Sequence, residues 1–411
     1  MKLSNSFYVG INITISLLSF FRSYIFLKQM NLYELGLVGL FQTILLLITL
    51  CQIGILNGSY RAFVSSSDSD RQTINNFTFT FFFGLTLVSS LIGIIVAFTY
   101  DTVILPVLIG GIISGILSLG VNYLANCFLA EVRVSDVNKL NIVSNGLGFL
   151  SLILVIYDPI LGLVSFIVQP LSFILFSFVL NPALIPNRLL FNRKILRYLL
   201  RLGFIPYLTA LLAYLSQQIE RWSIVSSLGI ETFGKYYLAL TYITLFALLP
   251  ASINNLFFAK MVKAYSERNL DDFYKMFSKY KRLLLYYCIA SILLTIFLAP
   301  EIVSYFFPQH IANLKYVYFV APGLLAITII NPILVYFNAA IEFKALTKSY
   351  SGGVVVVAIL VIAYYIGEII SLELIAVTDS IGNIVISILV FYYYRKSSKS
   401  KLIKKSTKSF I

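Results

Sequence analysis

The stretch TVILPVLIGGIISGILSLGVNYLANCFLA at residues 102–130 decides the fold, because it carries no charged side chain and is bounded by Asp101 and Glu131. A helix of about 20 apolar residues crosses a hydrocarbon core of about 30 Å, so this stretch predicts one transmembrane helix. Eleven further stretches lack Asp, Glu, Lys and Arg, and they run approximately over residues 3–21, 35–60, 72–100, 140–157, 159–187, 202–219, 236–259, 283–300, 316–341, 349–367 and 380–394. We therefore predict an all-α integral membrane protein with 12 transmembrane helices.

Composition and charge placement support a multi-pass membrane protein. Hydrophobic residues make up 59% of the chain, charged residues only 12%, and the mean hydropathy is +0.90, which excludes an ordinary soluble globular protein. The net charge of +14 does not indicate a nucleic-acid partner, because most Lys and Arg residues fall in alternate connections between the spans. The positive-inside rule then predicts that both termini lie in the cytoplasm.

No catalytic, metal-binding or nucleotide-binding constellation is visible in the sequence. The motif G-x-x-x-x-G-K-[S/T] is absent, so nucleotide hydrolysis is not expected to drive any transport. The cysteines Cys51, Cys127 and Cys288 lie inside apolar spans without metal-like spacing, and the single histidine, His310, is predicted in an exposed outer loop. We expect no metal, no cofactor and no catalytic residue.

An internal repeat emerges when the two halves are offset by 199 residues, which brings Arg22 onto Arg221 and Arg61 onto Lys260. Six predicted spans separate equivalent positions, so the halves keep the same orientation and are predicted to be related by a parallel pseudo-two-fold axis. The prediction is an N-terminal six-helix bundle at residues 1–187, a cytoplasmic linker at 188–201, a C-terminal six-helix bundle at 202–394 and a polybasic cytoplasmic tail at 395–411.

Four ionisable side chains directly border charge-free stretches and are counted with the predicted spans, and they are Arg22, Glu220, Arg221 and Asp379. A charge at the bilayer centre costs about 2.5–3.5 kcal/mol on insertion scales, so such groups face a protein interior or water and are the first candidates for a functional site. Two alternatives stay open. Both arginines lie in the outer halves of their helices and can extend to the headgroups, and Asp379 can form a structural ion pair with one of them.

Amide side chains inside the spans form a second set of candidates, among them Asn126, Gln217, Gln218 and Asn254. Their dipoles suit the lining of a hydrated cavity and the binding of sugar hydroxyls, although single amides also bridge packed helices. Outside the spans, Phe273, Met276, Phe277 and Tyr280 follow helical spacing between charged residues, which predicts an amphipathic helix lying at the inner membrane interface.

Four motifs carry a family resemblance, and they are Gly203-Phe-Ile-Pro206, Glu220-Arg221, Leu228-Gly229 and Phe233-Gly234-Lys-Tyr236. With them, the chain resembles the polysaccharide transport family, the Wzx-type O-antigen flippases of the multidrug/oligosaccharidyl-lipid/polysaccharide (MOP) exporter superfamily, which is MATE-like in fold. Members often carry Asp where this chain has Glu220. The resemblance implies a transporter rather than an enzyme, built from two six-helix bundles that open alternately to either side of the bacterial inner membrane.

The resemblance also implies a cargo, namely an undecaprenyl-pyrophosphate-linked oligosaccharide, the repeat unit of O-antigen or a related surface polysaccharide in lipopolysaccharide biosynthesis. Carried over, Arg22 and Arg221 would be cavity cations for the pyrophosphate, joined by Asn126, Gln217, Gln218 and Asn254 as substrate-binding residues. Glu220 and Asp379 are the candidates for coupling to H⁺ or Na⁺. Expected partners are membrane lipids, a polysaccharide polymerase and chain-length proteins. The alternatives are a MATE-like small-molecule or cation antiporter and an O-antigen polymerase.

Overall fold

The computed structural model describes residues 5–65, 68–97, 104–131 and 133–408, and within these ranges every regular element is helical. Eleven stretches of the described residues are long and apolar enough to cross a membrane, and helix α1 (Asn5–Gln29) precedes them in the chain. The predicted class, an all-α integral membrane protein, is confirmed.

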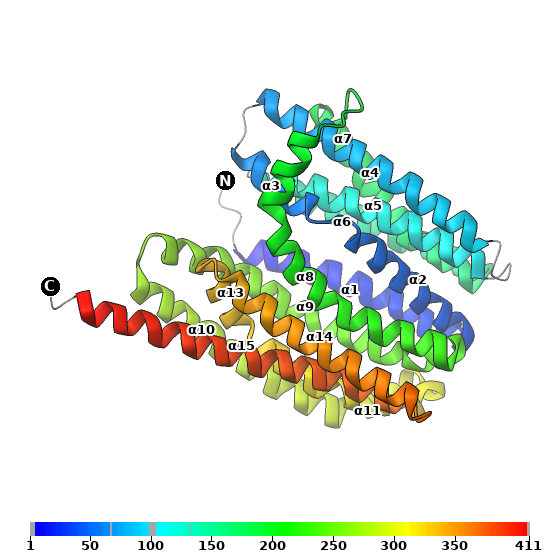
Figure 1. The fold of residues 1–411 in the computed structure, drawn as a ribbon. Coiled ribbons are helices and arrows are strands. Elements are labelled where there is room, and N and C mark those ends of the chain that lie inside the picture. The colour runs from blue at the N-terminus through cyan, green and yellow to red at the C-terminus, as the bar shows by residue number, and fades with distance from the viewer. Residues whose placement is uncertain (1–4, 66–67, 98–103, 132, 409–411) are drawn as a thin grey trace. The chain divides into compact units, whose positions relative to one another are not determined.

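The helices of the first half, all visible in Figure 1, are α1, α2 (Leu32–Leu50), α3 (Ile55–Ser65), α4 (Asp68–Ala97), α5 (Ile104–Ala130), α6 (Val134–Leu150) and α7 (Ser165–Leu180). The helices of the second half are α8 (Arg193–Leu228), α9 (Ile230–Ser266), α10 (Leu270–Leu293), α11 (Ala299–Phe306), α12 (Leu314–Ile329), α13 (Asn331–Ala339), α14 (Phe343–Ile366) and α15 (Leu372–Lys408). A π-helical turn at Leu294–Leu298 joins α10 to α11. The predicted polybasic tail continues α15 as helix through Lys408.

The chain divides into two compact units, of which unit 1 comprises Met1–Leu211 and Gly229–Tyr237, and unit 2 comprises Leu212–Leu228 and Leu238–Ile411. Helices α8 and α9 each contribute residues to both units. Because these units follow contacts rather than the order of the chain, the predicted boundary at residues 188–201 stays a prediction.

Glycines allow close helix approaches inside unit 1. A Cβ atom on Gly111 or Gly115 of α5 would meet the Ile44 or Ile48 side chain of α2 at 3.0 and 2.6 Å. A Cβ on Gly234 of α9 would collide with the backbone carbonyl of Leu32. Small residues of this kind let backbones in a membrane protein pack closely, as they do here for α2 against α5 and the start of α9.

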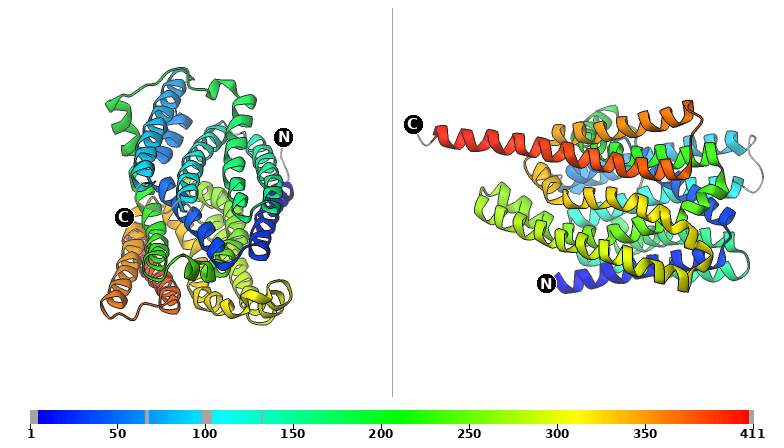
Figure 2. Two further views of the ribbon diagram at one scale, coloured as in Figure 1. Left: turned by 90° about the vertical axis from the view of Figure 1, so that its right-hand side faces the viewer. Right: turned by 90° about the horizontal axis from the view of Figure 1, so that it is seen from below.

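Unit 2 has its own packing, in which α15 lies along α12 and α14, as Figure 2 shows for α14 and α15. The segment predicted as an interfacial amphipathic helix is instead the first part of α10, which runs unbroken into an apolar span. Phe273 and Tyr280 are fully buried, and Phe277 stacks on Tyr394 at 5.8 Å between ring centroids. The interfacial prediction is wrong because the aromatic face packs against protein.

His310, predicted to be exposed, is only 2% exposed.

Prolines inside the helices free backbone carbonyls, since proline has no N–H to donate to the residue four positions earlier. In unit 1, Pro206 of α8 frees the carbonyl of Leu202, which accepts a hydrogen bond from Arg61 Nη1 at 3.0 Å. In unit 2, Pro250 of α9 frees the carbonyl of Phe246, which accepts one from the Tyr287 hydroxyl at 2.7 Å. Side chains of neighbouring helices thus satisfy the freed groups, as a bilayer interior requires.

Near Pro322 of α12, the hydroxyl of Ser380 takes the place of one backbone hydrogen bond of the helix. Ser380 Oγ of α15 donates to the carbonyl of Phe319 and accepts from the N–H of Gly323 at 3.1 Å. These two backbone groups would otherwise bond to each other as residues i and i+4 of a helix. Ser380 therefore ties α15 to α12 at the proline.

Candidate functional site

Arg22 of α1 is a half-buried cation within an apolar helix, and its guanidinium contacts helix α7. The guanidinium carbon lies 4.1 Å from the ring centroid of Phe166, and Nη1 donates a hydrogen bond to Gln169 Oε1 at 3.1 Å. Residues i and i+3 share one helix face, so Phe166 and Gln169 hold the guanidinium from the same side of α7. Cation–π stacking favours such an arrangement where water is scarce.

The depth of Arg22 bears on the alternative in which it extends to the headgroups. Arg22 lies seven residues before the end of α1, or about 10 Å along the helix axis. Its side chain turns onto α7 rather than continuing along its own helix, because it reaches Phe166 and Gln169. The contacts made by Arg22 are those of a cation facing protein.

A further amide side chain, Asn145, extends this contact into a chain of hydrogen bonds in which the donor and acceptor of each bond are fixed. Gln169 Nε2 donates to Asn145 Oδ1 of α6 at 3.0 Å, and Asn145 Nδ2 donates to the backbone carbonyl of Asn141 at 2.7 Å. Arginine can only donate, so the Gln169 oxygen must face Arg22, and its NH₂ group must then face the Asn145 oxygen. The helix carbonyl at the end of the chain accepts the last bond. We call Arg22, Phe166, Gln169 and Asn145 the Arg22 cluster.

The local sequence of α7 explains how it presents these partners. Pro170 frees the carbonyl of Phe166, and Ser114 Oγ of α5, a fully buried hydroxyl, donates to that carbonyl at 3.0 Å. The Phe166 ring also packs on Phe41, with 5.4 Å between ring centroids. On α6, a Cβ at Gly148 would come within 2.9 Å of the Gln169 Cβ, so glycine there makes room for Gln169.

The charge of Arg22 has no acidic counterpart within the described residues. Within the described residues, no ion pair joins Arg22 to a carboxylate. Among the titratable side chains, the phenol of Tyr237 interacts electrostatically with Arg22. An arginine stays protonated in proteins, so the Arg22 cluster keeps a full positive charge. Nη1 bonds Gln169, and among the described residues Nε and Nη2 make no hydrogen bond. Within the described residues, the Arg22 cluster therefore carries a positive charge that no carboxylate compensates.

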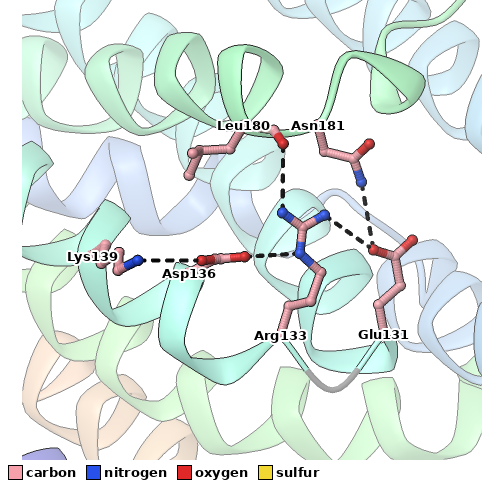
Figure 3. Close-up of polar contacts among 6 residues, drawn as sticks. All are labelled: Glu131, Arg133, Asp136, Lys139, Leu180 and Asn181. Carbon is pink, nitrogen blue, oxygen red and sulfur yellow. Dashed lines mark hydrogen bonds and ion pairs between the residues drawn. The ribbon is translucent and has the colours of Figure 1, made fainter.

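A second arginine on the cytoplasmic side of the predicted topology shows the opposite arrangement (Figure 3). Arg133 Nε lies 2.8 Å from Asp136 Oδ2, Nη1 lies 3.5 Å from Glu131, and the guanidinium also stacks over Phe128 at 4.7 Å. Its Nη2 donates to the carbonyl of Leu180 near the end of α7, at 3.5 Å. Two carboxylates compensate this cation, and a helix C-terminus accepts its remaining donor, so its role is structural.

Unit 2 carries the other predicted ionisable residues, and all three are buried: Glu220 is 3% exposed, Arg221 9% and Asp379 6%. Asp379 accepts a hydrogen bond from Asn383 Nδ2 at 3.2 Å and interacts electrostatically with Arg221. Arg221 therefore has a carboxylate in its surroundings, whereas Arg22 does not. The two arginines that the repeat equates occupy different electrostatic environments.

The four predicted amides are spread over α5, α8 and α9. Gln218 accepts from Trp222 Nε1 at 3.1 Å, and Asn254 accepts from the Tyr280 hydroxyl at 3.1 Å. Asn126 and Gln217 are half-buried. Their roles as substrate-binding residues stay predictions, and within the described residues no group of His, Cys, Asp and Glu is arranged to hold a metal ion.

Sequence reasoning missed Phe166, Gln169 and Asn145. Gln169 and Asn145 are amides inside charge-free spans, which is the signal that selected the other four. What distinguishes them is that Gln169 contacts Arg22 and Asn145 contacts Gln169, which depends on how α1, α6 and α7 pack.

Comparison with known proteins identifies the fold. No protein-family model matches the chain, and no curated protein matches it in sequence. Among solved structures, the chain resembles an inward-facing MATE family multidrug resistance transporter of the MOP superfamily (TM-score 0.65, 14% identity, 96% of this chain and 98% of that one). It also resembles the lipid II flippase MurJ in an inward closed conformation (TM-score 0.71, 16% identity, 94% and 87%).

A third similar structure is a MOP superfamily transporter from Pyrococcus furiosus, for which a reversed polarity of the binding pocket suggests a different function (TM-score 0.56, 15% identity, 95% and 94%). With coverage this complete, the chain has the fold of MOP superfamily transporters. The low identities limit the likeness to the fold.

Proposed function

We propose that this protein is a flippase that moves undecaprenyl-pyrophosphate-linked oligosaccharides, the repeat units of O-antigen or a related surface polysaccharide, across the bacterial inner membrane by alternating access. The observation that carries the proposal is the Arg22 cluster, a permanent cation held by neutral partners. A lipid II flippase among the similar structures supports a lipid-linked cargo.

The chemistry of the cargo fits the residues available. Guanidinium groups bind phosphate oxygens through paired, charge-assisted hydrogen bonds, so Arg22 would receive the pyrophosphate. Arg221 is the second cation proposed for it. The sugar hydroxyls need neutral donors and acceptors, for which we propose the amides Asn126, Gln217, Gln218 and Asn254. The lipid tail needs no site, because it can stay in the hydrocarbon.

Coupling to H⁺ or Na⁺ is assigned to Glu220 and Asp379, the buried carboxylates of unit 2. If phosphate draws Arg221 away from Asp379, the carboxylate left behind must take up a proton or a sodium ion. Both termini lie in the cytoplasm in this proposal. The partners are membrane lipids, a polysaccharide polymerase and chain-length proteins.

A second candidate function, a MATE-like antiporter of small cations, is favoured by one observation. Unit 2 buries two carboxylates, Glu220 and Asp379, and a buried acidic site is what an organic cation requires. Removal of Arg22 would leave that site intact, so the two candidates differ in their dependence on Arg22.

The proposal is tested by replacing Arg22 in a strain whose surface polysaccharide depends on this protein. Arg22→Ala removes charge-assisted hydrogen bonds worth about 1.5–3 kcal/mol, so export should fall by roughly ten- to a hundredfold while protein levels hold. The matched control is Lys28→Ala, which removes an exposed cation from the same helix. Accumulation of undecaprenyl-pyrophosphate-linked repeat units in the Arg22→Ala strain alone supports the proposal, and normal surface polysaccharide in that strain contradicts it.

A further inference from the structure

The Arg22 cluster holds its guanidinium through an amide, whereas carboxylates hold the guanidinium of Arg133. We propose that Gln169, fixed by Asn145, is the specificity-determining and positioning residue of this site. It orients Arg22 without neutralising it, so that the cluster selects a phosphate or pyrophosphate group. The inference rests on the proposed function, because it names the chemical group that the Arg22 cluster would recognise.

The first step is the fixed orientation of Gln169. The chain Arg22 to Gln169 to Asn145 to the Asn141 carbonyl contains hydrogen bonds of 3.1, 3.0 and 2.7 Å. A donor-only group lies at one end and an acceptor-only group at the other, so each amide has a single productive orientation. Gln169 therefore always offers its oxygen to Arg22 and never its NH₂ group.

The second step is the comparison with Arg133, which the same chain provides. Each guanidinium stacks on a phenylalanine ring, Phe166 at 4.1 Å and Phe128 at 4.7 Å. Arg133 donates to carboxylates, whereas Arg22 donates to an amide oxygen. A carboxylate neutralises Arg133, whereas a neutral amide leaves the positive charge of Arg22 uncompensated. In this inference, only Arg22 can therefore bind an anion.

The third step concerns the N–H donors of Arg22 that do not bond Gln169. An arginine carries five N–H donors in a planar fork, which matches two oxygens of a phosphate. Among the described residues, one of these donors is used, by the bond to Gln169, and the ring of Phe166 covers one face of the guanidinium. The edge formed by Nε and Nη2, which can form paired bonds with an oxyanion, makes no hydrogen bond within the described residues.

The decisive variant is Gln169→Glu, which keeps the size and the acceptor for Arg22, adds a negative charge and removes the NH₂ donor to Asn145. It should turn the Arg22 cluster into a compensated pair like that of Arg133, so the anion must compete with a carboxylate held in place. We expect the protein to remain folded and its affinity for pyrophosphate to fall at least about tenfold. Gln169→Met, neutral but without an acceptor, should weaken binding by about three- to tenfold. Gln29→Glu, the same chemical change at an exposed position of α1, should bind like the parent protein.

The assay is ligand-dependent thermal stabilisation of the full-length protein in nanodiscs, with inorganic pyrophosphate, undecaprenyl pyrophosphate and undecaprenol as probes. A ligand that binds only the folded state raises the melting temperature, and at a fixed ligand concentration the rise grows with the logarithm of the affinity. Without ligand, Gln169→Glu should melt close to the temperature of the parent protein, because the new ion pair with Arg22 offsets the lost hydrogen bond to Asn145. A purely structural role for Gln169 would instead lower stability and binding together.

Each outcome separates the inference from the proposed function. Loss of pyrophosphate stabilisation in both Arg22→Ala and Gln169→Glu supports the inference. Loss in Arg22→Ala but full stabilisation in Gln169→Glu overturns it and leaves the proposed function standing. Stabilisation by inorganic pyrophosphate but not by undecaprenyl pyrophosphate supports the anion site and contradicts the lipid-linked cargo. If Gln169→Glu does not fold, Gln169→Met decides, and parent-like binding by that variant overturns the inference.

Discussion

Ser114→Ala tests whether Ser114 stabilises α7 by satisfying the backbone carbonyl that Pro170 frees next to the Arg22 cluster. The variant removes the donor to the Phe166 carbonyl, a group that Pro170 leaves without its backbone partner. An unsatisfied buried polar group costs about 1–3 kcal/mol, whereas hydrogen bonds between membrane helices average only about 0.6 kcal/mol. Ser114 is fully buried, and no backbone N–H can replace it at this carbonyl, so we expect a loss of about 1.5 kcal/mol.

The assay is equilibrium unfolding in mixed micelles, combined with a double-mutant cycle. In the Pro170→Ala background, the backbone N–H of residue 170 can bond the Phe166 carbonyl itself, so Ser114→Ala should cost less than about 0.5 kcal/mol there. Ser118→Ala on the same helix, a half-buried serine, is the control and should change stability by less than about 0.5 kcal/mol. An equal cost of Ser114→Ala in both backgrounds, or no cost in either, would refute the reasoning.

Two further predictions concern packing and a second proline. Gly234→Ala should destabilise the protein by about 1–3 kcal/mol, because its methyl group would collide with the Leu32 carbonyl. Gly84→Ala, in open space on α4, should instead stabilise it by up to about 1 kcal/mol, and the same sign for both variants in chemical unfolding would argue against this packing. Tyr287→Phe leaves the Phe246 carbonyl without its donor, so the unfolding free energy should fall by about 1 kcal/mol, and an unchanged value would show that water or another group replaces the hydroxyl.

The helices and the fold class could be predicted because long apolar runs need no tertiary information. The stretch at residues 102–130 becomes α5, Ile104–Ala130, with little change at its ends. The start of α10 was mispredicted because a helical stripe of aromatic residues has the same pattern whether it faces lipid or protein. Only the packing of Phe273 and Tyr280 inside unit 2 distinguishes the two.

The candidate site could be predicted only in part, and Arg22 shows why. Its charge inside an apolar helix marked it in the sequence, whereas its partner Gln169, and Asn145 which bonds Gln169, lie more than 100 positions away in the chain. The repeat likewise equated Arg22 with Arg221, but Asp379 gives Arg221 a different electrostatic environment. Charge inside a span can be found from one sequence, but charge compensation depends on three-dimensional contacts.

The central claim is that the uncompensated guanidinium of Arg22 binds the phosphates of a lipid-linked glycan. Transport by the purified protein in liposomes tests this claim most directly. The measurement is the rate at which undecaprenyl-pyrophosphate-linked oligosaccharide moves between leaflets, for the parent protein, Arg22→Ala and Lys28→Ala. We predict that the parent and Lys28→Ala move the lipid at similar rates and that Arg22→Ala is slower by at least about tenfold. Equal rates for all three, or no movement of this lipid by the parent protein, would contradict the account.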